Sequence, residues 1–97
     1  MRRAFFAPSF LRELEDSLVY IEEQFGESVR RGVRDELADT CTLLCRLPAL
    51  GKTEHNYATS LAGFVFRVNW IFFEYDDEQV RFLHIIDGRR DKKSIAF

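Results

Sequence analysis

The 97-residue chain is long enough for one domain with a single modest core and too short for two. Its hydrophobic fraction of 46% is ordinary, but ten Phe residues are unusual and indicate a dense core or a surface that another chain covers. The formal net charge of −2 provides no global basic field, which argues against a general nucleic-acid binder and against sequence-specific nucleic-acid binding by the chain alone.

The first half of the chain predicts a strand followed by two helices. Residues 3–7 are short, apolar and followed by a proline, which is typical of an edge strand. Ser9 is a suitable N-cap for the first helix, and Gly26 is a natural C-terminal stop. A second helix over 27–46 follows after that single glycine, so we expect an antiparallel helical hairpin. Gly32 lies inside the second helix at a cost of about 1 kcal/mol relative to Ala, and close approach of the helices is one explanation for it. The predicted buried stripes are Phe10, Leu11, Leu14, Leu18, Ile21 and Phe25 in the first helix and Val29, Val33, Leu37, Cys41 and Leu44 in the second.

The second half predicts a mainly antiparallel sheet, because long apolar runs rich in β-branched and aromatic residues alternate with short polar segments. Arg67 would lie inside the first long strand and His84 inside the second. The expected segments are a loop over 48–55, a short strand over 56–61, a turn at Ala62-Gly63, a long strand over 64–75, an acidic loop over 76–79, a strand over 80–86 and a basic exit over 88–91.

The predicted order is therefore strand, helix, helix, strand, strand, strand. We expect a single α+β domain over residues 1–97, in which a short N-terminal strand and an antiparallel helical hairpin precede a three-stranded, mainly antiparallel sheet. A sheet this apolar needs covering on both faces, by helices, by a partner, or by both.

The order of elements and three local sequences resemble the RelE/ParE superfamily of toxins from type II toxin–antitoxin modules. Residues 47–51 (LPALG) look like the P-x-x-G corner that follows the helical hairpin in the ParE branch. Residues 66–70 (FRVNW) are similar to an arginine-containing strand of the RelE branch. Residues 87–91 (DGRRD) look like the H-G-x-R-D strand end of the ParE branch, with Asp87 in place of His. The long hairpin and the corner favour the ParE branch.

The resemblance implies a toxin with a cognate antitoxin partner, and the two branches differ in target. ParE-like members inhibit DNA gyrase by direct binding, which is the function we expect here. The alternatives are a ribosome-dependent mRNA endonuclease of the RelE type and a non-toxic binding or corepressor subunit. The chain would be an enzyme only in the endonuclease alternative.

An endonuclease site would need a base for the 2′-hydroxyl, cations for the phosphate and an acid for the leaving group. The resemblance implies that Arg67 and either Arg89 or Arg90 would contact the phosphate, and His84 is the nearby residue of a type suited to acid–base chemistry. Ala58 and Ser60 replace the lysines of the RelE pattern, and the chain ends in Phe rather than a catalytic Tyr. The candidate catalytic residues, for the RelE alternative only, are Arg67, His84, Arg89 and Arg90.

The basic exit and the short basic tail over 92–97 are the candidate contact region for the target or the antitoxin. An antitoxin segment is expected along the helical hairpin and the sheet, as an added strand or as an amphipathic helix in a groove. Its acidic side chains would then screen the basic exit from the target. The alternative is that these cations are simply solvated and that Arg67 pairs with a carboxylate at the sheet edge. The candidate contact residues are Arg89, Arg90, Lys92, Lys93 and Phe97.

Cys41 and Cys45 are the only cysteines and lie one helical turn apart, which provides no disulfide framework and fits a reducing cytoplasmic setting. With His55 and His84 they are four potential zinc ligands, but cysteines on an apolar helical stripe are typical of a core. We therefore expect neither a metal nor another cofactor. No signal peptide is visible, and no run approaches the roughly 18 apolar residues of a membrane span.

Overall fold

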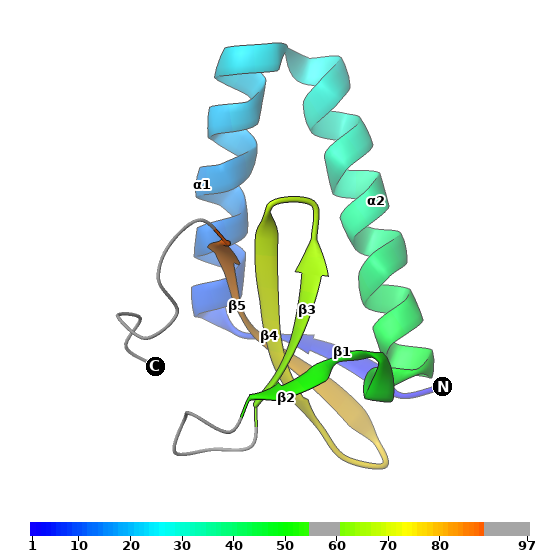
Figure 1. The fold of residues 1–97 in the computed structure, drawn as a ribbon. Helices are drawn as coiled ribbons and strands as arrows, with labels where there is room; N and C mark the ends of the chain where they lie inside the picture. The colour runs from blue at the N-terminus through cyan, green and yellow to red at the C-terminus, as the bar shows by residue number, and fades with distance from the viewer. Residues whose placement is uncertain (55–60, 89–97) are drawn as a thin grey trace.

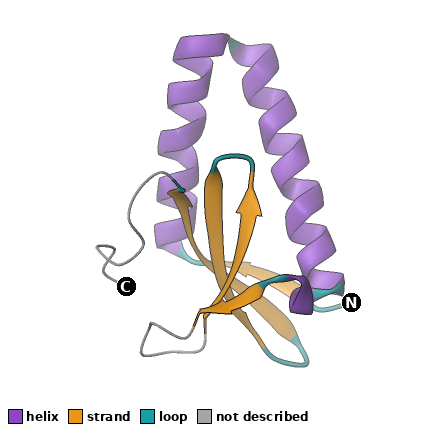
Figure 2. Cartoon of the chain, viewed as in Figure 1, coloured by secondary structure: helices purple, strands orange, loops and turns teal. Residues whose placement is uncertain are grey.

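One helical hairpin and one mixed sheet make up the fold (Figure 1). The computed structural model describes residues 1–54 and 61–88. The fold class is α+β, as predicted, with the two helices beside the sheet (Figure 2). The elements are β1 (Arg3–Phe6), α1 (Pro8–Phe25), α2 (Glu27–Arg46), the 3₁₀ turn η1 (Pro48–Leu50), β2 (Lys52–Glu54), β3 (Leu61–Phe66), β4 (Asn69–Tyr75) and β5 (Gln79–Asp87).

The helical hairpin is confirmed, and α2 has the predicted bounds. Gly26 joins the two helices with a φ of 94°, a conformation that glycine adopts without the steric cost of a Cβ atom. The prediction of Ser9 as the N-cap is wrong, because α1 begins at Pro8 and Ala7 is the capping residue. Proline is favoured at this first position, where its missing N–H would have no helical acceptor. The Ser9 hydroxyl instead donates a 2.7 Å hydrogen bond to the Leu83 carbonyl.

Only parts of the two predicted stripes are buried. In α1, Phe10 and Leu18 are buried, whereas Leu11 is 50% and Phe25 is 65% exposed. Leu11 follows Phe10 directly and therefore points about 100° away from it around the helix. In α2, Val29 is also exposed, and the other four stripe residues are buried. The joined ends of the helices project beyond the strands (Figure 1), so the side chains there have no sheet to pack against.

The sheet has the strand order β1-β5-β4-β3-β2. β1 is an edge strand, as predicted, and pairs in parallel with β5, with Phe6 opposite Phe82. The other neighbouring strands are antiparallel. The expected mainly antiparallel sheet is therefore confirmed, but the described residues after the hairpin contribute four strands to it instead of three.

The additional strand arises because the apolar run over 64–75 forms two strands instead of one. β3 ends at Phe66, β4 begins at Asn69, and Arg67 with Val68 forms the two-residue loop between them. Arg67 has a φ of 56°, in the left-handed region that such loops require. The prediction that Arg67 lies inside a strand is therefore wrong. The sequence conceals the loop because Gly, Asn or Asp usually marks such a turn, and neither loop position carries one of them.

The segment before this hairpin also differs from the prediction. β2 lies inside the predicted loop over 48–55 and pairs Lys52 with Gly63. Ala62 and Gly63 belong to β3 and do not form a turn. The strand predicted over 56–61 therefore overlaps β3 at Leu61, and its remaining positions lie outside the described residues.

Aromatic rings fill the core between the helices and the sheet. Phe10, Phe73 and Phe82 are fully buried, and the ring of Phe82 has its centroid 5.9 Å from those of the other two. Phe6 stacks on the same ring at 5.1 Å. Aromatic pairs at these distances contribute about 0.5–1.5 kcal/mol each beyond the burial of their area. These four residues account for much of the Phe excess.

Two glycines have opposite surroundings. A Cβ atom at Gly51, the last residue of the P-x-x-G corner, would lie 2.9 Å from Cε1 of Phe73, closer still to its Cζ, and 3.1 Å from Cβ of Ala62. The corner therefore needs glycine because a core ring occupies the space. Among the described residues, a Cβ atom at Gly32 would meet no atom of another element within 4 Å, so close approach of the helices does not explain this glycine.

Candidate functional site

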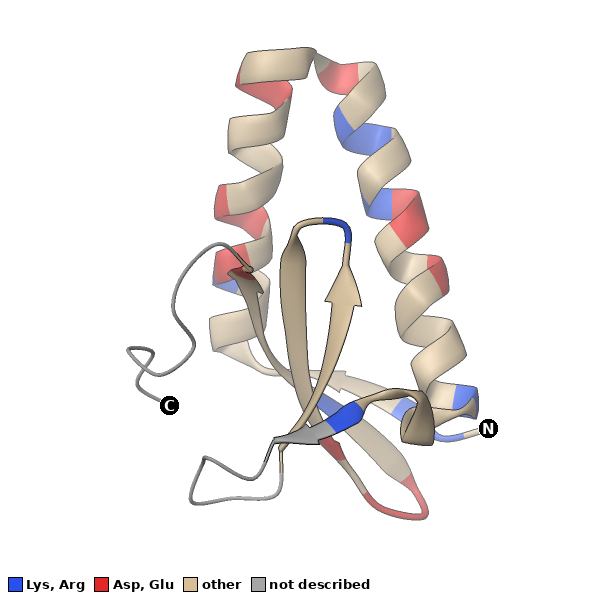
Figure 3. Ribbon diagram, viewed as in Figure 1, with Lys and Arg blue, Asp and Glu red and all other residues tan. Residues whose placement is uncertain are grey.

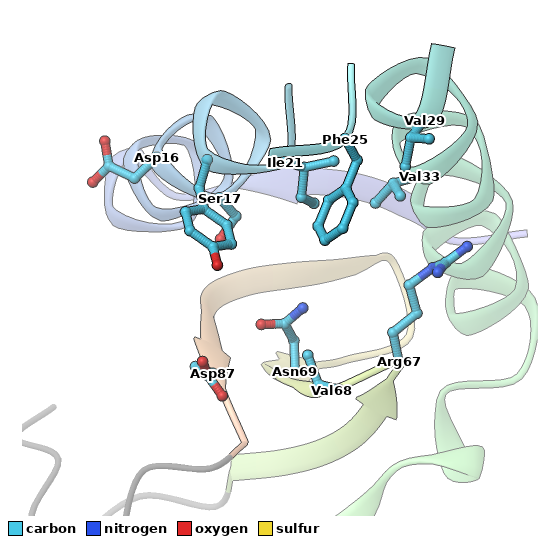
Figure 4. A pocket seen from close by; sticks show the side chains of 11 residues that line it. Asp16, Ser17, Ile21, Phe25, Val29, Val33, Arg67, Val68, Asn69 and Asp87 are labelled. Atoms are coloured by element: carbon cyan, nitrogen blue, oxygen red, sulfur yellow. The ribbon is translucent and has the colours of Figure 1, made fainter. Parts of the chain in front are cut away.

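A groove of about 720 Å³ lies between the projecting part of the helical hairpin and the β3–β4 loop (Figure 4). Both helices and the loop contribute apolar side chains to it. Several of these are exposed, with Phe25 at 65%, Val68 at 60%, Tyr20 at 57% and Val29 at 44%. Large apolar side chains that gather in one exposed depression are typical of a surface that binds another molecule. The apolar lining residues are Tyr20, Ile21, Phe25, Val29, Val33 and Val68.

The charged lining residues lie at opposite ends of the groove. Asp16 of α1 and Asp87 at the end of β5 lie on one side, and Arg67 lies on the other, nearer α2 (Figure 4). Asp16 belongs to α1, along which acidic residues are spread with a single arginine among them (Figure 3). The groove is therefore apolar along its middle and of opposite charge at its two ends.

The side chain of Arg67 forms an ion pair with Glu36 of α2 at one end of the groove. Its Nη2 donates a 2.6 Å hydrogen bond to Oε2 of Glu36, and both side chains are 50% exposed. Arg67 is the only residue other than glycine with a positive φ among the described residues. The backbone thus adopts an unfavourable conformation at a residue that places a cation in this groove.

His84 is bound to α1, at the edge of the sheet. β1 pairs with β5 only as far as Phe82, and Glu13 of α1 contacts the part of the strand that follows. The Ile85 N–H donates to Oε1 of Glu13 at 3.2 Å, and Nδ1 of His84 lies 3.1 Å from the same oxygen. A carboxylate that bridges strand and helix explains the histidine as a structural contact.

The structure does not bring Arg67 and His84 together. His84 is opposite Phe72, and Asp87 is opposite Asn69, which directly follows the β3–β4 loop. The three residues from His84 to Asp87 correspond to about 10 Å of strand. The two candidate catalytic side chains therefore contact different helices and do not converge on one phosphate position.

The remaining predicted contact residues lie outside the described residues, which end at Gly88. The Gly88 N–H donates a 2.6 Å hydrogen bond to the Val68 carbonyl, so the chain leaves the described fold beside the groove. A Cβ atom at Gly88 would lie 2.8 Å from that carbonyl oxygen and 3.1 Å from Cδ1 of Trp70. The residues in question are Arg89, Arg90, Lys92, Lys93 and Phe97.

The acidic loop between β4 and β5 has a structural explanation. Oδ1 of Asp76 accepts the backbone N–H groups of Glu78 and Gln79, and Oδ2 accepts a hydrogen bond from Arg81 at 3.0 Å. These donors, the two backbone groups first, lower the pKa of Asp76 to about 2. The loop is therefore fixed by its own side chains.

The two cysteines are part of the core. Both are free and buried, and burial raises the pKa of the Cys41 thiol to about 12, with a smaller contribution from Cys45. His55 lies outside the described residues, and within the described ranges no three His, Cys, Asp or Glu residues are placed to hold a metal ion. No helix in the described part of the chain is long and apolar enough to cross a membrane.

Sequence reasoning does not identify the groove itself. The apolar spacing predicts Phe25 and Val29 in buried stripes, and it gives no signal for Tyr20, Val68 or Asn69. The grouping of these residues depends on where the β3–β4 loop lies relative to the helices. One sequence feature indicates the groove: apolar residues lie on both sides of Gly26, at the turn between the two helices. Side chains so close to that turn are far from the sheet, which therefore does not cover them.

Comparison with known proteins identifies one family from the sequence and a similar fold among solved structures. The model of a family described as the ParE toxin of the type II toxin–antitoxin system, parDE, matches residues 4–92. A solved structure described as the chromosomal ParDE toxin–antitoxin system from P. aeruginosa is similar in fold, with a TM-score of 0.75 at 9% sequence identity. That similarity covers 90% of this chain and 96% of the other. No curated protein matches the sequence significantly.

Proposed function

This chain belongs to the family of ParE toxins of type II toxin–antitoxin systems, and from that premise we propose that it arrests growth by binding DNA gyrase in the cytoplasm. In this proposal the protein acts as a binding inhibitor without nuclease activity. A cognate antitoxin neutralises it. The observation that supports binding over cleavage is the separation of Arg67 from His84, each paired with a carboxylate of a different helix.

The antitoxin occupies the groove in this proposal. An amphipathic segment would cover the exposed aromatic and β-branched side chains, which the isolated chain leaves in contact with water. Because Val68 both lines the groove and accepts the Gly88 N–H, a segment bound there would lie next to the point where the basic exit begins. Occupation of the groove would therefore hinder access of the target to that exit.

Growth and supercoiling assays test the toxic activity. Induced expression of the chain should arrest bacterial growth, and coexpression of the antitoxin should restore it. Purified protein should inhibit supercoiling by gyrase, and unchanged supercoiling at large molar excess would exclude gyrase as the target. New codon-phased 5′ ends in transcripts, abolished by Arg67→Ala, would identify the mRNA endonuclease instead. Unaffected growth would identify a non-toxic binding or corepressor subunit.

Calorimetry with matched variants tests the antitoxin site. Phe25→Ala should weaken antitoxin binding about tenfold or more, because large side chains at the centre of an interface dominate its affinity. Leu11→Ala removes an apolar side chain of similar exposure on the same helix, outside the groove, and should leave the affinity unchanged. Equal effects of the two variants would contradict the proposed site.

Screening of the basic exit is tested separately. Replacement of Arg89, Arg90, Lys92 and Lys93 by alanine should weaken the complex more at low salt than at high salt, because the attraction that these variants remove acts between charges. Truncation of Phe97 should add a salt-independent decrease in affinity. A complex that is indifferent to all of these changes would leave neutralisation by occlusion without support.

A further inference from the structure

The ion pair between Arg67 and Glu36 has features that a structural tether does not explain. Both side chains are half exposed, and ion pairs of this kind contribute little to stability. Gly or Asn would adopt the left-handed backbone conformation of Arg67 at lower steric cost. A strained residue that is not glycine indicates a role for its side chain beyond the fold itself.

The guanidinium of Arg67 can bind another carboxylate in place of that of Glu36. In the described part of the chain its ion pair is made through Nη2, at 2.6 Å from Oε2 of Glu36. An arginine side chain has five N–H donors in a planar fork that binds carboxylates in a bidentate manner. Glu36 lies on a solvent-exposed position of α2, so its carboxylate can return to water when it is displaced.

We propose that Arg67 is the anchor for an acidic side chain of the antitoxin and that Glu36 occupies this position in the free protein. This inference rests on the proposed function, in which the antitoxin binds the groove. On binding, the antitoxin carboxylate replaces Glu36 on the guanidinium while its apolar side chains cover Phe25 and Val29. The exchange is one charged hydrogen bond for another, so it adds recognition at small energetic cost.

The opposite end of the groove then fixes the direction of the bound segment. Asp16 lies across the groove from Arg67 (Figure 4). A segment with an acidic side chain at the Arg67 end and a basic side chain at the Asp16 end is complementary at both ends. The reversed segment would place like charges together at both, which disfavours it. The partner is therefore an amphipathic segment with charges of opposite sign at its two ends.

Isothermal titration calorimetry of the full chain with the antitoxin that neutralises it is the direct test. Glu36→Gln removes the competing carboxylate and should tighten binding about two- to fivefold, which corresponds to the modest strength of an exposed ion pair. Arg67→Gln should weaken binding about tenfold or more, because the carboxylate of the bound antitoxin would then be covered without a cationic partner. In the Arg67→Gln background, Glu36→Gln should have no further effect.

Two further variants separate recognition from folding. Glu27→Gln removes an exposed carboxylate of the same helix that pairs with Arg31 at 2.9 Å, outside the groove, and should leave the affinity unchanged. Arg67→Gly suits the loop backbone, so its melting temperature should not fall, while its affinity should fall as in Arg67→Gln.

The possible results distinguish the role of the ion pair from the proposed function. If the pair only tethers the loop to α2, Glu36→Gln and Arg67→Gln should weaken binding together, and this result would overturn the anchoring role alone. An unchanged affinity of Glu36→Gln would do the same. Failure of the unaltered chain to bind the neutralising antitoxin would overturn both.

Discussion

Replacement of Gly51 by alanine should destabilise the protein, because the new methyl group would occupy space that the Phe73 ring already fills. The Cβ atom would lie 2.9 Å from Cε1 of that ring, closer to Cζ, and 3.1 Å from Cβ of Ala62. Phe73 is fully buried, with its ring centroid 5.9 Å from that of Phe82, so the ring has little room in which to move.

The expected magnitude follows from two opposing effects. Overpacking of a dense core costs about 1–3 kcal/mol. The backbone at Gly51, with φ −73° and ψ 144°, suits alanine, so the lower entropy of the unfolded chain contributes about 0.4–1 kcal/mol in the other direction. The steric cost is larger, and each kcal/mol of net destabilisation lowers the melting temperature of a domain of this size by about 4–8 °C.

Urea and thermal denaturation should be compared with those of Gly32→Ala. That glycine lies inside α2 with open space around it, so alanine should stabilise the helix by about 0.5–1 kcal/mol. The same chemical change is thus expected to have opposite signs at the two positions. A Gly51→Ala protein at least as stable as the unaltered chain would refute the steric explanation of the corner.

Other residues give further expectations. Phe10→Ala should lower the free energy of unfolding by about 3–5 kcal/mol in a denaturant titration, because its ring is fully buried. Phe25→Ala, at a side chain that is 65% exposed, should change it by no more than about 0.5 kcal/mol. Comparable destabilisation by both would contradict the assignment of Phe25 to a free surface. The pKa of Asp76 falls from 3.8 to about 2 on folding, so its contribution to stability is complete above the unfolded value and disappears as the pH falls from 3.8 toward 2. Asp76→Asn should therefore flatten the acid limb of the stability curve, and an unchanged limb would count against the loop hydrogen bonds. In Gly88→Ala the new Cβ would lie 2.8 Å from the Val68 carbonyl oxygen, which accepts the hydrogen bond of the residue 88 amide. The substitution should therefore abolish hydrogen-exchange protection of that amide with little effect on the core. Retained protection would show that the chain exit tolerates a side chain.

The local parts of the fold are predictable because their causes lie within a few residues of one another. Gly26 ends one helix and starts the next, and the apolar periodicity over 27–46 gives α2 its bounds. The polar residues after β4 predict an acidic loop, and Asp76 accepts hydrogen bonds from its neighbours there. The family resemblance, based on the order of elements and on short motifs, is confirmed by the family match over 4–92.

The candidate site is harder to predict, since each of its residues acquires its role from a distant element. The sequence singles out Arg67 but predicts a strand around it, because a run of β-forming residues conceals a hairpin loop without Gly or Asn. His84 lies in the predicted strand, but its bond to Glu13 depends on how α1 crosses the sheet edge. The gyrase target and the contact residues beyond Gly88 stay predictions.

The helical hairpin, the α+β class and the family follow from the order of the residues alone, since periodicity, turn residues and motifs are local in the chain. The projection of the hairpin past the sheet is a property of the folded molecule. That projection exposes Phe25 and Val29 and places the β3–β4 loop opposite them, so that Arg67 and Asp16 lie at the two ends of one groove. Apolar spacing shows which face of a helix is hydrophobic, but the length of the neighbouring strands determines how much of that face is covered.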